Sequence, residues 1–180
     1  MAVKLVKPIN HKKVVKITNQ DFEAKMRELR INSDIALAVS GGPDSLALMH
    51  LSNRYALNNN INLTVLSIDH GIRAESSKEI VWLEKIAKKN KINFYSTKLK
   101  KKIKSSNTLS MARTLRYEAL SKYCSKKKIK FLLTAHHLDD EIENFLMRLI
   151  RGSGIKGLSS LKVKSRFKNT NLILVRPLLE

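Results

Sequence analysis

Cysteine is almost absent from this sequence, and its scarcity limits the chemistry available. Cys124 is the single cysteine in 180 residues. One thiol cannot form an intrachain disulfide, and it cannot supply the ligands of a Cys-rich zinc or iron–sulfur site. Long apolar runs are missing as well, because no window holds the roughly 18 apolar residues that a membrane-spanning helix needs. We therefore expect no cysteine-held metal and no membrane as a partner.

The amino-terminal stretch lacks both acidic residues and a sustained apolar core. Residues 1–20 carry five lysines, but a secretory signal also requires the apolar segment. A mitochondrial presequence is basic too, although this stretch has no arginine. The expected location is the cytoplasm. We expect residues 1–30 to form a basic arm and a first helix, followed by one domain over residues 31–180.

Acidic residues are few, and the formal charge is +20. A chain this basic is usually one that meets polyanions. The alternative is an A/T-rich coding sequence, because lysine outnumbers arginine by 25 to 10. Both explanations stay open. The two densest lysine runs, at 98–104 and 126–130, contain no aromatic residues, which argues against stacking on single-stranded bases there.

Buried strands are predicted to alternate with amphipathic helices along the chain. The predicted strands are Asp34–Ser40, Leu63–His70, Ile92–Leu99 and Lys130–His136. The predicted helices are Asp44–Asn58, Ser76–Asn90, Leu109–Lys127 and a fourth that carries Ile142 to Ile150 on one face. Leu161–Phe167 and Leu172–Arg176 are predicted to pair as a hairpin. This alternation predicts a three-layer α/β fold with a mostly parallel sheet, whose ligands lie beyond the carboxyl ends of the strands.

Glycine is also scarce, with six residues in three places. Glycine is favoured where the backbone takes a positive φ or approaches a ligand closely. We therefore expect three turns of unusual backbone geometry, at 41–42, 71 and 152–157. These turns are the first places to look for chemistry.

The first of these turns has the sequence SGGPDS, at 40–45, between a predicted strand and a predicted helix. Paired glycines let successive amides point inward and hold an anion, and the helix adds its positive amino-terminal end. The alternative is a tight turn in which Ser or Asp caps the helix. The spacing excludes the Walker and dinucleotide motifs.

Four further segments carry candidate functional residues. His70 and Arg73 follow the second predicted strand, beside the first loop, although such residues are also common on surfaces. Arg113 and Arg116 share one helix face and could clamp phosphate, or form an ordinary solvated face. The segment AHHLDDEIEN, at 135–144, could bind magnesium or transfer protons, and its first acids could instead cap a helix. RGSGIKGL, at 151–158, fits a loop that grips phosphate, although Gly152 could be only a helix cap.

SGGPDS resembles the S-G-G-x-D-S signature of the N-type ATP pyrophosphatases, which cleave ATP between its α- and β-phosphates. The motifs DHGIR, R-x-x-R-Y, AHHLDDEIEN and RGSGIKGL follow in the order found in the tRNA(Ile)-lysidine synthetase family. The resemblance covers residues 35–177. It implies a PP-loop fold of the adenine nucleotide alpha hydrolase kind. It also implies ATP and Mg²⁺ as cofactors, and free L-lysine and a CAU-anticodon tRNA(Ile) as substrates. The wobble cytidine is adenylated, and lysine then displaces AMP to give lysidine.

The resemblance also assigns roles to residues. It implies that the catalytic residues are Asp44, His70, Arg113, His137 and Asp140, of which Asp44 and Asp140 bind the metal. It implies that ATP is bound by Ser40, Gly41, Gly42, Pro43, Asp44 and Ser45. It implies that substrate and tRNA are contacted by Arg73, Arg116, Arg151, Gly152, Ser153, Gly154 and Lys156.

Two departures from the family pattern leave alternatives. Asn144 stands where the family has Thr, and family members continue into carboxyl-terminal tRNA-binding domains that we expect to be absent here. The chain is then either a lysidine synthetase catalytic domain or a truncated, non-catalytic remnant that binds ATP and tRNA. A third alternative is another N-type ATP pyrophosphatase with a different acceptor. The related tRNA thiolases need catalytic or cluster-binding cysteines, which this sequence lacks. Monomer and homodimer both stay open.

Overall fold

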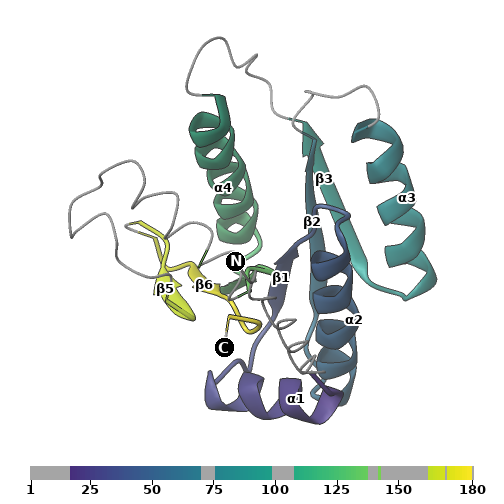
Figure 1. Ribbon diagram of the computed structural model, residues 1–180, viewed down its shortest axis with the longest axis vertical. Coiled ribbons are helices and arrows are strands. Elements are labelled where there is room, and N and C mark those ends of the chain that lie inside the picture. The colour runs from purple at the N-terminus through teal and green to yellow at the C-terminus, as the bar shows by residue number, and fades with distance from the viewer. Residues whose placement is uncertain are drawn as a thin grey trace, which may run out of the picture.

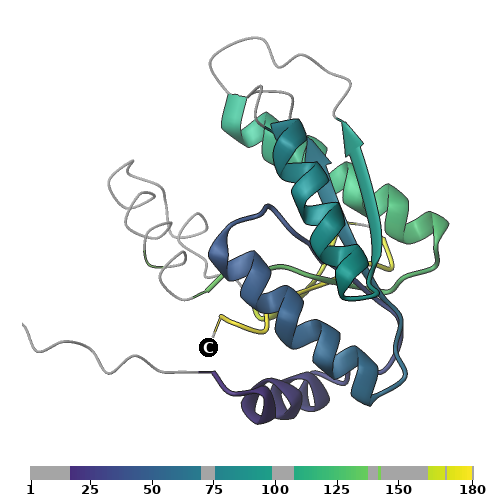
Figure 2. The same ribbon diagram turned by 90° about the vertical axis from the view of Figure 1, so that its right-hand side faces the viewer.

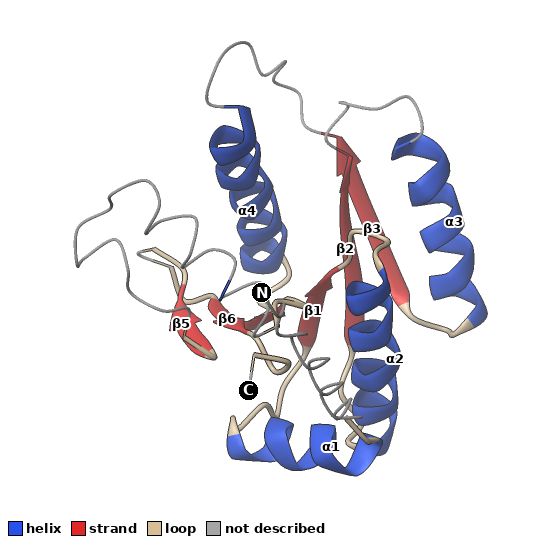
Figure 3. Ribbon diagram, in the orientation of Figure 1, coloured by secondary structure: helices blue, strands red, loops and turns tan. Residues whose placement is uncertain are grey.

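The computed structural model describes residues 17–69, 76–98, 108–137, 142, 162–168 and 170–179. Helices and strands alternate through most of these residues (Figures 1 and 3). In chain order they are α1 (Asn19–Glu28), β1 (Ile35–Ala38), α2 (Pro43–Asn58), β2 (Leu63–Asp69), α3 (Ser76–Lys89), β3 (Asn93–Lys98), α4 (Thr108–Lys126), β4 (Phe131–Leu133), β5 (Lys164–Arg166) and β6 (Ile173–Val175).

The predicted elements are confirmed where the structure describes them, with shorter strands than expected. For example, β4 ends at Leu133 and not at His136. Thr134 donates its backbone N–H to Val175 but lies outside the ladder. Of the predicted helix after His137 the structure describes only Ile142, which is exposed.

One mixed sheet of six strands has the order β3-β2-β1-β4-β6-β5. β1 lies at the centre, parallel to β2 on one side and to β4 on the other. β3 and β6 extend the parallel part, and β5 pairs antiparallel with β6 as the predicted hairpin. Because the central strands are parallel, the segments after β1, β2 and β4 lie at one edge of the sheet.

Helices cover both faces of the sheet, which confirms the three-layer prediction. α2 and α3 lie on one face and α4 on the other (Figures 1 and 2). The side chains of β1 alternate between the two apolar cores. Ile35 and Leu37 pack in the core that includes α1, α2 and α3, and Ala36 packs in the core that includes α4.

Two residues beyond the end of each of the four helices that the structure describes lies a residue that has a positive φ and is not glycine. These residues are Arg30, Asn60, Lys91 and Lys128, with φ between 52° and 57°. The following residue is always isoleucine, and its N–H donates to a carbonyl five residues earlier, as in Ile92 to Ala87 at 2.9 Å. This is the Schellman motif. The expectation of only three unusual turns, all at glycine, is therefore wrong, because hydrogen bonds and apolar contacts offset the left-handed backbone at these lysine, arginine and asparagine residues.

α1 packs in the core, and the residue that follows it is hydrogen-bonded to the carboxyl-terminal hairpin. Phe22 and Met26 are buried in the core shared with α2 and α3. Lys164 of β5 donates from Nζ to the carbonyl of Leu29 at 2.6 Å. Among the described residues, no helix is both long enough and apolar enough to cross a membrane.

Candidate functional site

The turn between β1 and α2 contains Gly41, the one glycine with a positive φ among the described residues. Gly41 has a φ of +91°, which an L-residue side chain rarely adopts. Gly42 returns to extended backbone, with φ −71° and ψ 161°, and is the N-cap residue of α2, which begins at Pro43. Pro43 then occupies the first helical turn, where its missing N–H costs no hydrogen bond.

No side chain caps the amino-terminal end of α2. The hydroxyl of Ser45 donates instead to the carbonyl of Gly42 at 2.8 Å, and the Asp44 side chain is 57% exposed. The alternative of a simple capped turn is therefore wrong. The first N–H groups of α2 and its positive end remain available for an anion.

The end of β4 brings a histidine to this loop. β1 and β4 are neighbours, so His137, which follows β4, lies near the start of α2. Its Nε2 is 3.7 Å from Oδ2 of Asp44. Two residues that the sequence placed in the catalytic group are thus next to each other, although 93 residues separate them in the chain.

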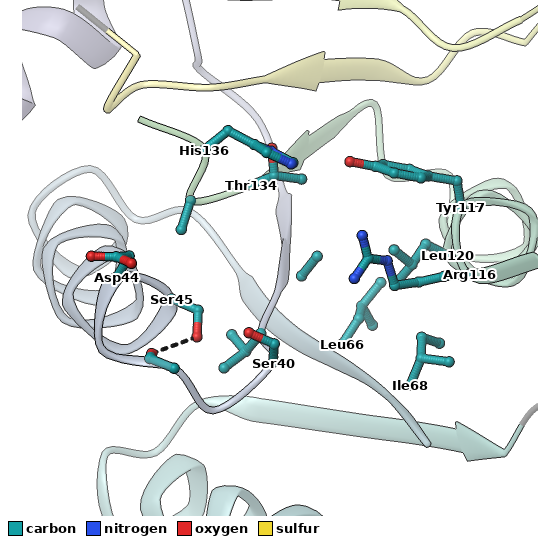
Figure 4. Close-up of a pocket in the computed structure, with 14 residues that line it drawn as sticks. Ser40, Asp44, Ser45, Leu66, Ile68, Arg116, Tyr117, Leu120, Thr134 and His136 are labelled. Carbon is teal, nitrogen blue, oxygen red and sulfur yellow. Dashed lines mark hydrogen bonds between the residues drawn. The ribbon is translucent and has the colours of Figure 1, made fainter. Parts of the chain in front are cut away.

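A cavity extends from this loop across the end of β2 to α4 (Figure 4). Its volume is about 190 Å³, compared with roughly 10–15 Å³ for a single water measured in this way. The floor is apolar and the rim is polar, which suits an organic group with a charged end. It is lined by Ala38, Val39, Ser40, Gly42, Asp44, Ser45, Leu66, Ile68, Arg116, Tyr117, Leu120, Thr134, Ala135 and His136.

Two guanidinium groups of α4 lie against one aromatic ring. The Cζ atoms of Arg113 and Arg116 are 5.3 and 5.5 Å from the ring centroid of Tyr117. Burial lowers the pKa of Arg116, and the like charge of Arg113 lowers it further, against an opposing effect of Tyr117. Arg116 still carries its charge at neutral pH. Among the described residues it has no carboxylate partner, so this wall of the cavity is suited to an anion.

Arg113 and Thr134 both contact the ring of His136. Arg113 Nη2 is 3.4 Å from His136 Nε2, and His136 Nδ1 is 2.9 Å from the hydroxyl of Thr134. A guanidinium can only donate, so in this contact Nε2 of His136 is the acceptor. The side chains of α4 and of the segment after β4 are therefore coupled across the cavity.

Other predicted site residues lie outside the described residues. They are His70, Arg73, Asp140, Arg151, Gly152, Ser153, Gly154 and Lys156. Within the described residues no group of three or more His, Cys, Asp or Glu side chains could hold a metal ion.

Sequence reasoning missed most of the residues that shape the cavity. His136 was predicted only as part of the segment AHHLDDEIEN, and Tyr117 only as part of the motif R-x-x-R-Y. Thr134 and the apolar floor of Leu66, Ile68 and Leu120 were not predicted. Thr134 and His136 alternate directly after β4, and that alternation is the signal that could have placed both on one side of the chain. The floor residues gave no signal, because in the sequence they read as ordinary core.

Cys124 takes no part in this site. It is fully buried in α4, and burial raises the pKa of its thiol to about 12. A thiolate is the reactive form of cysteine, so this residue cannot serve as a nucleophile near neutral pH.

Comparisons with known proteins agree with the loop geometry. The family model of the PP-loop domain (ATP_bind_3) matches residues 10–180. The chain is 46% identical over 146 residues to the tRNA(Ile)-lysidine synthase of Rickettsia bellii, covering 81% of this chain and 33% of the relative. It is 42% identical over 162 residues to the synthase of Rickettsia typhi, covering 88% of this chain and 37% of the relative. The chain thus spans about a third of the length of these curated relatives.

Two solved structures share the fold. The U34-tRNA thiolase of Methanococcus maripaludis superposes with a TM-score of 0.72 at 24% identity, covering 88% of this chain and 58% of the thiolase. The NH3-dependent NAD synthetase of Campylobacter jejuni superposes with a TM-score of 0.56 at 14% identity, covering 90% and 66%. With the uncapped glycine turn after β1 and a family match over residues 10–180, this chain belongs to the PP-loop domain family.

Proposed function

We propose that this chain binds ATP and cleaves it between the α- and β-phosphates to adenylate a substrate. The supporting observation in the structure is the turn at 41–42, whose N–H groups and uncapped helix end suit the pyrophosphate part of ATP. The apolar floor of the adjoining cavity suits a nucleobase. The proposal assigns this chemistry to residues 31–180, with residues 1–30 as an arm and first helix.

The acceptor that we propose is the wobble cytidine of a tRNA(Ile) with a CAU anticodon. The observation that carries this step is the 46% and 42% identity to relatives named tRNA(Ile)-lysidine synthase. The oxygen on carbon two of the cytidine attacks the α-phosphorus, and pyrophosphate leaves. An amine of free L-lysine then attacks carbon two, loses its proton, and displaces AMP. The reaction takes place in the cytoplasm.

In this proposal some site residues bind the triphosphate of ATP, and others position the cytidine that accepts the adenylyl group. Segment 40–45 holds the phosphates by its N–H groups. Arg116 in the opposite wall, with Arg113 beside the ring of Tyr117, offsets negative charge. Preorganised donors of this kind are the main source of transition-state stabilisation in phosphoryl and nucleotidyl transfer. His137 lies beside Asp44 and is the candidate for proton transfer. His70, Arg73, Asp140 and the 151–156 loop complete the proposed site.

The described part of the site fits magnesium. Asp44 offers an exposed carboxylate at the start of α2, next to where the phosphates would lie. Mg²⁺ is commonly held by one or two carboxylates together with substrate phosphates, so a large protein cluster is not required. Asp44 would hold the ion, with Asp140 as the second proposed ligand. The ion would neutralise charge that develops on the leaving pyrophosphate.

Labelled lysine incorporation tests the proposal. The chain is incubated with radiolabelled lysine, ATP, Mg²⁺ and tRNA(Ile) bearing CAU. We expect label in the tRNA, and a loss of at least about a hundredfold in Asp44→Ala, because the variant loses a group that acts on the transition state. Arg54→Ala is the matched control, since Arg54 is an exposed residue of the same helix, outside the cavity lining.

Two results would contradict the proposal in different ways. Unchanged incorporation by Asp44→Ala would contradict the assigned mechanism. ATP binding without incorporation, while a full-length relative is active in parallel, would favour the non-catalytic alternative.

A further inference from the structure

The hydroxyl group of Tyr117 is a buried polar group that the fold leaves without a partner. Tyr117 is 7% exposed, and its Oη has no hydrogen-bond partner among the described residues. A buried tyrosine normally pairs its hydroxyl, because leaving it unpaired sacrifices the hydrogen bond to water. Tyr55 shows the usual arrangement, since its hydroxyl donates to the carbonyl of Ile31 at 2.6 Å.

Tyr117 lies in the wall of the cavity that contains the glycine loop. Tyr117 and Arg116 both line it, opposite Ser40 and Ser45. Figure 4 shows the hydroxyl at the end of the ring that points toward Thr134 and His136. The fold therefore leaves a buried, unpaired hydroxyl on a residue that lines the cavity.

The ring of Tyr117 also supports both guanidinium groups of α4. Arg113 and Arg116 lie 5.3 and 5.5 Å from its centroid, within the range of a cation–π contact. Arg116 has no carboxylate among the described residues, although burial makes an unpaired charge costly. An unpaired cation and an unpaired hydroxyl on adjacent residues of one helix are two donors for the same kind of acceptor, an anionic oxygen.

We infer that Tyr117 is a phosphate-binding residue, whose hydroxyl donates to a phosphate oxygen of a nucleotide that Arg116 binds at the same time. The inference rests on the proposed function, because the shared cavity with the glycine loop makes phosphate the expected anion. It adds a residue and an atom to which the resemblance to known enzymes assigned no role. The ring holds the guanidinium groups, and the hydroxyl contacts the ligand.

Tyr117→Phe separates the two roles, because it removes the hydroxyl and keeps the ring. We measure affinities for adenosine, AMP and an ATP analogue with a methylene bridge between the α- and β-phosphates, by titration calorimetry. We expect about tenfold weaker binding of AMP and of the analogue, from the loss of one charge-assisted hydrogen bond. Adenosine binding and the melting temperature of the free protein should not decrease, because the hydroxyl has no partner in the protein.

Tyr55→Phe is the matched control. Its hydroxyl bonds to the backbone, so its loss should lower the melting temperature of the free protein by about 2–4 °C. Its nucleotide affinity should stay unchanged, because Tyr55 does not line the cavity.

Equal binding of all three ligands by Tyr117→Phe and wild type would overturn the inference and leave the proposed function standing. An equal loss with adenosine would overturn it too, because the hydroxyl would then contact the nucleoside. A wild-type chain that binds none of the ligands would overturn both proposals.

Discussion

Some polar side chains around the cavity have hydrogen-bond partners within the protein, and others have none among the described residues and can bind a ligand. Ser45 is buried and its hydroxyl is used within the loop, where it donates to Gly42. Arg116 and Tyr117 are also withdrawn from solvent, but the described residues offer Arg116 no carboxylate and the Tyr117 hydroxyl no acceptor. Buried polar groups without partners are uncommon, so such groups in a cavity wall are the strongest residue-scale indication of function.

The two glycines of the loop should respond differently to alanine. Gly41→Ala should lower the free energy of unfolding by about 1–2 kcal/mol, because a φ of +91° is unfavourable for an L-residue. Space is not the cause, since the new Cβ would meet Leu83 Cδ1 at 3.9 Å, an ordinary contact. Urea unfolding followed by circular dichroism measures the change.

Gly42→Ala is the control for this prediction. Its φ is −71° and its new Cβ would lie 3.8 Å from the hydroxyl oxygen of Ser40. The variant should be as stable as wild type, or slightly more stable, because alanine reduces the entropy of the unfolded chain. Equal losses in both variants would show that the positive φ is not what requires glycine here.

At the scale of elements, the helix ends explain how a chain with so few glycines makes its turns. Two residues beyond each described helix lies a left-handed lysine, arginine or asparagine, and the next residue is an isoleucine that precedes a strand. Ile31, Ile92 and Ile129 are buried. Burial of the isoleucine and the added hydrogen bonds offset the backbone cost, so glycine is not required.

Substitution by glycine should have opposite effects on the free energy of unfolding after the end of α3 and inside it. Lys91 has φ 56° and is exposed, so Lys91→Gly should raise the free energy of unfolding by about 0.5–1 kcal/mol. Lys85 is exposed inside α3, and Lys85→Gly should lower it by about 1 kcal/mol. The midpoints of urea unfolding measure both changes in free energy, provided that the dependence on urea concentration has the same slope as in wild type. A loss of similar size at both positions would contradict the assigned helix end.

Across the whole molecule, the net charge of +20 is larger than the site itself requires. If the excess lysines bind tRNA phosphates, affinity for tRNA should fall steeply with salt. For six or more phosphate contacts the loss between about 50 and 200 mM salt is roughly a thousandfold. Filter binding across this range measures the slope.

Binding of adenosine is the control, because an uncharged ligand releases no counterions and should show little salt dependence. If tRNA affinity does not change with salt concentration, the excess of lysine reflects the composition of the coding sequence and not tRNA binding.

Local sequence alone determined the order and type of the elements, the parallel pairing and the loop at 40–45. These features depend on apolar periodicity and on special residues that act over a few positions, which is why they can be predicted. Helix ends at lysine were not predicted, because left-handed lysine has no sequence signal comparable to glycine.

Tertiary structure alone decided the cavity. Asp44 meets His137 only because β4 lies beside β1 in the sheet. Leu66 and Leu120 became its floor, and Tyr117 acquired an unsatisfied hydroxyl, only when α4 packed across the sheet. Whether a buried polar group has a partner depends on residues far away in the chain, so the physical property that best indicates function here exists only in the folded molecule.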